Sequence, residues 1–184
     1  FVQPDGDVSQ AYGVGINPTR ELLAFGDFDR DGVDDLLFRN TGNAFTYYAS
    51  GGDINQAEGL GHQTGREVLA VGDFLDDNRD DVLFRDTATG FTFVMDDARP
   101  DRVVGLGNQA GREGWAVGDF DGDGGDDILF RDTGTGFTFK VENANINRAE
   151  GLGDQSTREL LAVADFTGDG KEDLVLRDTG SGYT

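Results

Sequence analysis

The chain has 184 residues, of which 36% are hydrophobic and 10% aromatic, a composition typical of a folded domain and too apolar for a disordered acidic tail. Its formal net charge of −21 makes nucleic acid and anionic lipid poor partners. Cysteine is absent, which excludes disulfides and cysteine nucleophiles, and no apolar run approaches the roughly 18 residues of a membrane-spanning helix, so membrane insertion is not expected.

A period of 46 residues organises the whole chain. The tripeptide "GDF" or "ADF" recurs four times, and its aspartates are Asp27, Asp73, Asp119 and Asp165. The repeats are 20–65, 66–111, 112–157 and 158–184 plus 1–19, because residues 1–19 align without a gap to the second half of the other units. The chain is therefore interpreted as one domain, 1–184, built from four repeats.

Each repeat predicts four short β-strands in chain order. The first, such as 22–28, contains small residues that allow close packing, and the second, such as "DILFR" at 127–131, is an apolar run typical of a strand covered on both faces. The third, "GFTFKV" at 136–141, alternates with a period of two, and "RAEGLG" at 148–153 gives a weaker fourth strand. No segment has a sustained helical period. The expected fold is all-β, a β-propeller of four-stranded blades.

The division of one repeat between the two chain ends predicts a ring of four blades closed through the termini. Two alternatives stay open at this point: the four repeats are an arc of a larger propeller, or half of a ring completed by another chain. The expected state is accordingly a monomer or a ring-completing dimer.

An acidic loop follows the first strand of every repeat, and "DFDGDGGDD" at 119–127 holds five carboxylates. The pattern D-x-D-x-D-G-x-x-D offers side-chain oxygens at positions 1, 3, 5 and 9, with a backbone carbonyl expected at position 7, and these are ligands that Ca²⁺ prefers. Glycine at position 6 permits the positive φ that the turn needs. An EF-hand is excluded because position 12 is phenylalanine or leucine instead of glutamate.

The four loops differ in completeness. The first and third are complete, the fourth has a hydroxyl at position 3 and should bind more weakly, and the second, with Leu75 at position 3 and Asn78 at position 6, is doubtful. The predicted ligands are Asp27, Asp29, Asp31, Val33 and Asp35; Asp73, Asp77, Arg79 and Asp81; Asp119, Asp121, Asp123, Gly125 and Asp127; and Asp165, Thr167, Asp169, Lys171 and Asp173.

At these loops the chain resembles the FG-GAP/VCBS repeat family, through "VGDFDGDGGDDILFRDTGTG" and "FGDFDRDGVDDLLFRNTG". The resemblance covers all four units. It implies a Ca²⁺-bearing β-propeller, as in integrin α heads and in bacterial and fungal propeller lectins, most of which have about seven blades. The lectins often have tryptophan where this chain has Phe38, Phe84, Phe130 and Leu176, so a sugar-stacking role at those positions does not carry over.

Other residues give weaker functional signals. The single histidine, His62, lies at a position that varies between repeats, so an enzyme is not expected. Two arginine columns recur, one before glutamate and one after the second strand, and we expect them to bridge adjacent blades; the alternative is a repeated anion or sugar site. Tyr12, Tyr47 and Tyr48 in or beside variable loops, and Trp115 in a column otherwise filled by leucine, are candidate ligand contacts.

Two functions remain. One is a calcium-stabilised glycan-binding module, which the resemblance favours, and the other is an adhesive protein-interaction module in which calcium only rigidifies the fold. Millimolar calcium outside cells would fill sites of modest affinity, so a secreted or periplasmic location is expected, with a glycan or an extracellular protein as the partner.

Overall fold

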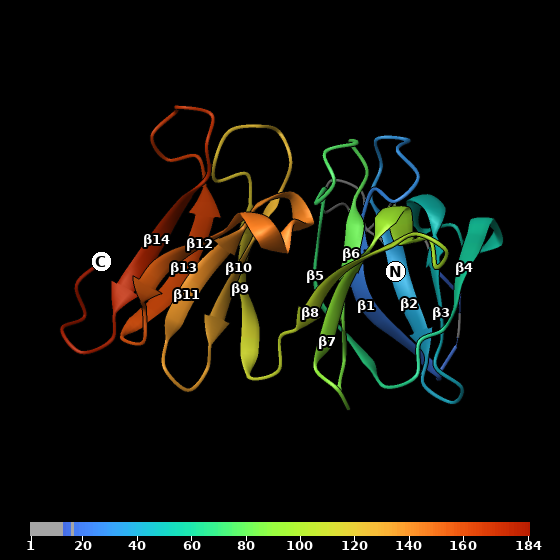
Figure 1. Cartoon of the computed structure of the whole chain (residues 1–184). Helices are drawn as coiled ribbons and strands as arrows, with labels where there is room; N and C mark the ends of the chain where they lie inside the picture. The colour runs from blue at the N-terminus through green and yellow to red at the C-terminus, as the bar shows by residue number, and fades with distance from the viewer. Residues whose placement is uncertain (1–12, 16) are drawn as a thin grey trace.

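The computed structural model describes residues 13–15 and 17–184, and the prediction that residues 1–19 complete the fourth repeat falls almost entirely outside them. The described residues are all-β, in four antiparallel sheets connected by loops and short 3₁₀ turns (Figure 1). None of their helices is long or apolar enough to cross a membrane.

Three of the sheets have four strands each, in the order in which the strands occur along the chain. The first contains β1 (Arg20–Gly26), β2 (Asp35–Asn40), β3 (Phe45–Ala49) and β4 (Ala57–His62). The second contains β5 (Arg66–Gly72), β6 (Asp81–Asp86), β7 (Phe91–Met95) and β8 (Val103–Asn108). The third contains β9 (Arg112–Gly118), β10 (Asp127–Asp132), β11 (Phe137–Val141) and β12 (Ala149–Asp154). The predicted four-strand repeat is confirmed in these units.

The fourth sheet has two strands among the described residues, β13 (Arg158–Ala164) and β14 (Asp173–Asp178). The first strands of successive sheets pack on one another, β1 on β5, β5 on β9 and β9 on β13, and β13 and β1 show no packing of similar extent. In Figure 1 the first and fourth sheets lie at opposite ends of the row. The described residues thus form an open row of blade-like sheets, and closure of the ring stays a prediction.

The core lies between the sheets. Phe28 and Leu37 of the first unit pack with Phe84 of the second, and Phe74 of the second packs with Phe130 of the third. The burial of the equivalent phenylalanine decreases along the row: Phe28 and Phe74 are at most 1% exposed, Phe120 is half-buried, and Phe166 is 58% exposed. The difference arises because Phe28 and Phe74 each have a following sheet to cover them, and no described sheet follows the fourth.

Beside the acidic loop, a pair of hydrogen bonds joins the first sheet to the second and the second to the third, while a single backbone bond, from Glu172 N–H to the carbonyl of Asp119 over 2.8 Å, joins the third to the fourth. Asp126 donates its backbone N–H to the carbonyl of Asp73 over 2.7 Å, and its side chain accepts the Asp73 N–H over 2.9 Å. Asp80 repeats both bonds with Asp27, at 2.9 and 2.8 Å. The carboxylate of Asp126 fits because the residue before Asp73 in the second sheet is glycine: a Cβ on Gly72 would lie 2.5 Å from Asp126 Oδ2. We call this contact the inter-sheet clasp.

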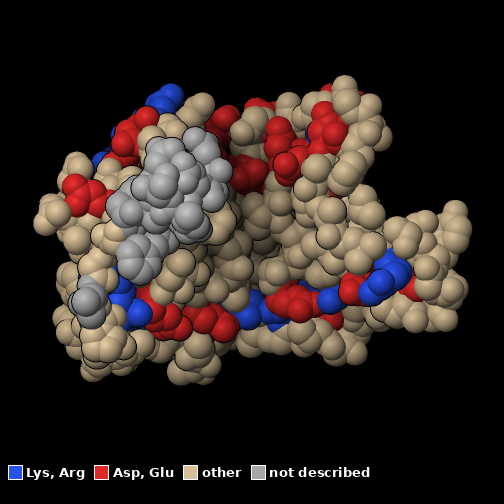
Figure 2. Space-filling model, turned by 180° about the vertical axis from the view of Figure 1, so that it is seen from behind, with Lys and Arg blue, Asp and Glu red and all other residues tan. Residues whose placement is uncertain are grey.

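The space-filling view from behind shows how charge is distributed (Figure 2). Acidic side chains gather along one edge, and acidic and basic side chains alternate along the opposite edge. Part of the charge is neutralised by ion pairs between the first two strands of a sheet, Arg85 with Glu67 and Arg131 with Glu113. Such partly exposed pairs contribute little stability individually.

Candidate functional site

The first acidic loop is built on the turn between β1 and β2. Its backbone amides point inward and hold the carboxylates: Gly32 N–H donates to Asp27 Oδ2 over 2.9 Å, and Val33 N–H donates to Asp31 Oδ1 over 2.8 Å. Gly32 has φ +83°, as predicted for position 6. A left-handed residue at this position lets the chain turn around a central point instead of passing it.

Three carboxylates of this loop converge. Asp27, Asp29 and Asp35 each place one oxygen within 4.8 Å of the others. Asp35 is fully buried and accepts from the N–H groups of Phe28, at 3.0 Å, and Gly51, at 2.8 Å. Burial nevertheless raises the pKa of Asp35 to about 6. Converging oxygens around a buried acid form a donor set of the kind that a hard divalent cation takes, so these residues fit Ca²⁺.

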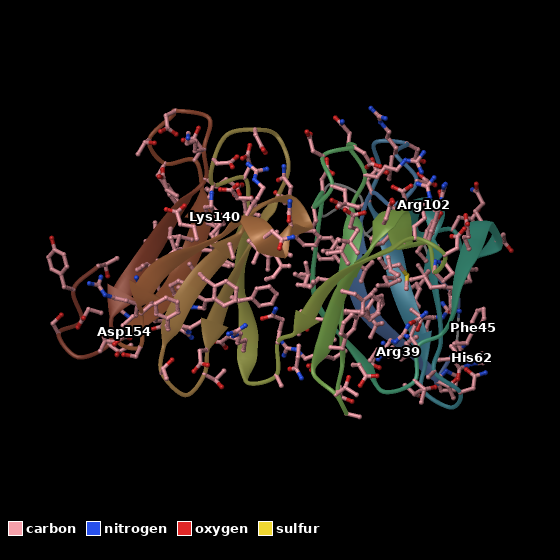
Figure 3. The ribbon with its side chains drawn as sticks, in the orientation of Figure 1. Arg39, Phe45, His62, Arg102, Lys140 and Asp154 are labelled. Atoms are coloured by element: carbon pink, nitrogen blue, oxygen red, sulfur yellow. The ribbon has the colours of Figure 1, made fainter. Side chains whose placement is uncertain are left out.

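The third loop resembles the first in its backbone and differs in its charges. Asp119, Asp121 and Asp123 converge within 4.8 Å, whereas Asp127, at position 9, is outside that set. Asp127 is fully buried, and burial raises its pKa to about 6. Its neighbour is Lys140, whose Nζ lies 3.5 Å from Asp127 Oδ2. Figure 3 shows Lys140 on the third sheet.

The second loop gathers carboxylates that its sequence pattern does not include. Asp77 converges with Asp96 and Asp97, which belong to the 3₁₀ turn η5 (Asp96–Ala98) after β7. Asp97 is 3% exposed, and its Oδ2 lies 3.3 Å from Arg79 and 3.4 Å from Arg102. The loop therefore carries its own guanidinium counter-charges. Sequence reasoning missed these acids because they lie 19 and 20 residues beyond Asp77 and meet it only through the pairing of the strands.

The position 9 acid of the second loop, Asp81, is fully buried, and burial raises its pKa to about 8. Its Oδ2 has no hydrogen-bond partner among the described residues, and its Oδ1 accepts the N–H of Asp97 over 2.8 Å. Asn78, which replaces the glycine, has φ +63°, in the left-handed region that asparagine tolerates.

The fourth loop holds its acids by amide bonds. Asp165 accepts from Gly168 N–H at 2.6 Å and Gly170 N–H at 3.0 Å, and these bonds lower its pKa. Asp173 accepts from Phe166 and Thr167, and Lys171 donates its N–H to Asp169. In the described part of the chain, these carboxylates do not converge within the distance seen in the other three loops.

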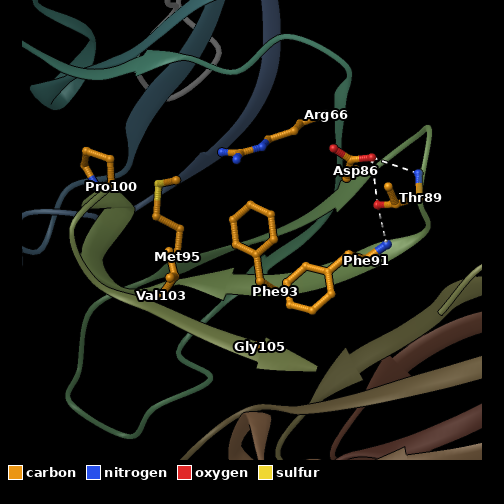
Figure 4. Close-up of a pocket in the computed structure, with 9 residues that line it drawn as sticks. All are labelled: Arg66, Asp86, Thr89, Phe91, Phe93, Met95, Pro100, Val103 and Gly105. Atoms are coloured by element: carbon orange, nitrogen blue, oxygen red, sulfur yellow. Dashed lines mark hydrogen bonds between the residues drawn. The ribbon is translucent and has the colours of Figure 1, made fainter. Parts of the chain in front are cut away.

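A cavity of about 400 Å³ opens on the second sheet, away from the acidic loops (Figure 4). Arg66 lies with its guanidinium carbon 4.9 Å from the centre of the Phe93 ring, and the ring of Phe91 continues the aromatic wall. Asp86 accepts from the backbone N–H and hydroxyl of Thr89, at 2.8 and 2.9 Å. The remaining lining residues are Met95, Pro100, Val103 and Gly105.

The two sets of repeated arginines have different partners, and only the set that precedes glutamate contributes a residue, Arg66, to this cavity. Arg85 and Arg131, of the column after the second strand, donate across to the carbonyls of Arg112 and Arg158 in the next sheet, as expected. Arg66, of the column before glutamate, instead donates to Gln63 and covers an aromatic ring. Arg112 repeats this pairing over Phe139, at 4.7 Å, whereas Arg20 covers Phe38, on the second strand of the first sheet, at 5.0 Å.

The aromatic candidates from the sequence are placed apart. Tyr48 is buried against Phe28 and donates its hydroxyl to Glu58 over 3.0 Å, whereas Tyr47 is half-buried beside Phe38. Trp115 lies half-buried in the third sheet, under the guanidinium of Arg131 at 4.8 Å. Tyr12 lies outside the described residues. Among the described residues, the structure therefore does not gather Tyr47, Tyr48 and Trp115 at one site.

His62 is exposed at the end of β4 and packs edge-on against Phe45, with 5.4 Å between ring centres (Figure 3). Its Nδ1 lies 2.9 Å from the carbonyl oxygen of Asn43.

The chain was compared with known proteins. No family model matches it, and no curated protein matches its sequence significantly.

Proposed function

We propose that the chain is a calcium-stabilised, carbohydrate-binding module that works outside cells and has no catalytic activity. The observation that carries the proposal is the cavity beside Arg66, where aromatic rings and hydrogen-bonding side chains share one surface. The carbohydrate class is supported by the chemistry of this lining, and the calcium by the converging acids of the first loop.

A sugar ring has apolar C–H faces and a rim of hydroxyl groups, so it needs both kinds of surface. Phe91, which is 45% exposed, offers the apolar face, and the buried Phe93 supports it from beneath Arg66. Arg66 carries guanidinium donors, and the carboxylate of Asp86 is an acceptor already oriented by Thr89. The volume of about 400 Å³ is within the usual range for small-ligand sites.

Repetition supports the same function. Because the arginine–aromatic pair recurs in the first and third sheets, several weak sugar sites would be held in one rigid body. Binding to a multivalent glycan would then gain avidity without any further contact. The resemblance to FG-GAP/VCBS propeller lectins points in the same direction, as an analogy.

For the fold, we propose that the row of sheets closes into a propeller, with residues 1–19 completing the fourth blade. Support comes from the inter-sheet clasp, whose two halves are unused at the ends of the row. Asp34, which corresponds to Asp80 and Asp126, makes no clasp with any described residue, and neither the backbone N–H nor the carbonyl of Asp165 does. A ring closure that joined Asp34 to Asp165 would also cover the exposed ring of Phe166.

The test is a glycan array probed with the labelled chain in millimolar calcium and again in EGTA. We expect binding to one class of sugar, lost in Arg66→Ala and retained in Arg177→Ala, which removes an arginine outside the cavity. Binding that survives Arg66→Ala would place the sugar elsewhere, and a blank array from a chain shown to be folded would reject the carbohydrate proposal.

The second candidate is an adhesive protein-interaction module, which the exposed apolar surface of the fourth unit favours. Phe166 is 58% and Leu161 is 44% exposed there. Unlike scattered surface apolar residues, Phe166 corresponds to residues that the first two units bury between sheets, and Leu161 corresponds to partly buried residues packed against the same clusters. Capture of an extracellular protein that Phe166→Ser abolishes, together with a blank array, would select this function.

A further inference from the structure

Lys140 is a basic residue at a core position. It lies on β11 and is 7% exposed, and the corresponding residues of the first two sheets are Tyr48 and Val94, both buried in the core between sheets. An ammonium group this buried needs compensating negative charge. The acidic loop beside it provides that charge.

Three carboxylates surround the ammonium. Lys140 Nζ lies 3.3 Å from Glu142 Oε1, 3.5 Å from Asp127 Oδ2 and 3.8 Å from Asp121 Oδ2. Asp121 and Asp127 are positions 3 and 9 of the third loop, so two of its four predicted carboxylate ligands already face a cation. Glu142 has a second partner, Arg148, at 2.7 Å.

The first loop, which has nearly the same sequence, provides the comparison for the charges around the third loop. Its predicted ligands Asp27, Asp29, Asp31 and Asp35 form no ion pair with a lysine or arginine among the described residues. The two loops also differ in which acids converge: the first set includes the buried position 9 acid, Asp35, and the third set excludes its counterpart, Asp127, which faces Lys140.

We infer that Lys140 is the resident cation of the third loop, where its ammonium neutralises the acids in place of a metal ion, and that the third loop therefore binds Ca²⁺ more weakly than the first. The inference rests on the calcium assignment proposed above and reverses the ranking from sequence, which treats both loops as complete. A calcium ion entering the third loop must displace the ammonium from Asp121 and Asp127 or tolerate its repulsion.

The consequence is a division of labour between loops of nearly identical sequence. The third loop carries one internal positive charge at any calcium concentration, so the sheet that carries it should depend on the ion less than the first sheet does. The first loop has no internal cation, so calcium-dependent stability belongs to the unit that contains Asp29 and Asp35.

Calcium titration by calorimetry on the full chain tests this directly. In the wild type, Asp29→Asn should remove the tightest binding event and Asp121→Asn should leave it. Lys140→Met keeps the length of the side chain and removes its charge, and should strengthen the third loop at least about tenfold, the effect of one positive charge about 6 Å from a divalent ion even at the dielectric constant of water.

Two controls separate charge from shape. Lys140→Arg keeps the charge and should gain no affinity, and Asp121→Asn in the Lys140→Met background should abolish the gain. Thermal unfolding in EGTA gives a readout without metal: Lys140→Met should melt below the wild type, because Asp127 loses its buried counter-ion, and calcium should restore more stability to this variant than to the wild type.

The outcomes distinguish the two proposals. Equal affinity of the first and third loops in the wild type, or a first loop that binds while Lys140→Met gains nothing, overturns the role of Lys140 and leaves the calcium assignment intact. Absence of calcium binding to every variant, Lys140→Met included, overturns both.

Discussion

The inter-sheet clasp predicts a specific steric coupling between Gly72 and Asp126. The ideal Cβ of an alanine at 72 would lie 2.5 Å from Asp126 Oδ2 and 3.0 Å from Val117 Cγ1, closer than real Cβ contacts. Gly72→Ala must therefore push the carboxylate off the Asp73 N–H, which it accepts over 2.9 Å, or part the second sheet from the third.

The expected cost follows from two contributions. Overpacking a close contact costs about 1–3 kcal/mol, and loss of a hydrogen bond to a charged acceptor costs about 1.5–3 kcal/mol. Asp126→Ala alone removes the bond and also the burial of a carboxylate whose pKa burial raises to about 6, so its net cost should be smaller than that of Gly72→Ala. In the double variant the methyl group of alanine finds the space that the carboxylate left.

Urea unfolding of the two single variants and the double variant forms a double-mutant cycle, measured in calcium and in EGTA. We expect Gly72→Ala to be destabilising in the wild type and nearly neutral in the Asp126→Ala background. Gly114→Ala is the matched control, since its Cβ would meet Leu69 at an ordinary 3.7 Å. An equal cost of Gly72→Ala in both backgrounds would refute the clasp.

Three further predictions concern metal, pH and packing. Asp29→Asn should lose most of the calcium-dependent rise in melting temperature, about 5–10 °C for an ion present at a hundredfold its dissociation constant, and a rise equal to the wild type's in a differential scan would contradict this. In EGTA, the urea midpoint should fall as the pH rises from about 5 to about 8. Burial raises the pKa of Asp35 and Asp127 to about 6 and that of Asp81 to about 8, so the folded chain binds more protons than the unfolded chain and loses this stabilisation as the three acids ionise. A midpoint that stays constant or rises with pH would contradict this. Phe137→Ala should cost about 1 kcal/mol in urea unfolding because the ring covers Gly151, where a Cβ would lie only 3.1 Å from Phe137 Cζ. Tyr183→Ala, at a ring that is 79% exposed, should cost nothing measurable.

Features repeated along the chain could be predicted from the sequence. The strands and their order follow from apolar runs and alternation within a 46-residue period, and the turn at each acidic loop follows from Gly32 and its counterparts, because both depend on neighbours in the chain.

Features that depend on neighbours in space could not be predicted in this way. Asp80 and Asp126 look like members of the ligand loops, yet they hold the preceding sheet. Lys140 is one residue in an alternating strand, and only the pairing of β10 with β11 shows that its ammonium meets Asp127. The cavity beside Arg66 likewise combines side chains from all four strands of the second sheet and from their loops, so no contiguous motif describes it.

The inter-sheet clasp has a direction, since at the first two junctions one sheet presents a backbone carbonyl and an amide and the next sheet presents an amide and a carboxylate. A repeat that carries one half of the clasp on each side can pack between any two of its copies. Tandem duplication of a 46-residue segment, inserted between Gly65 and Arg66, would therefore give every sheet the neighbours it already has. The array can therefore lengthen by gene duplication without any new type of contact between sheets. Its free energy of unfolding should increase by a nearly constant amount per added repeat.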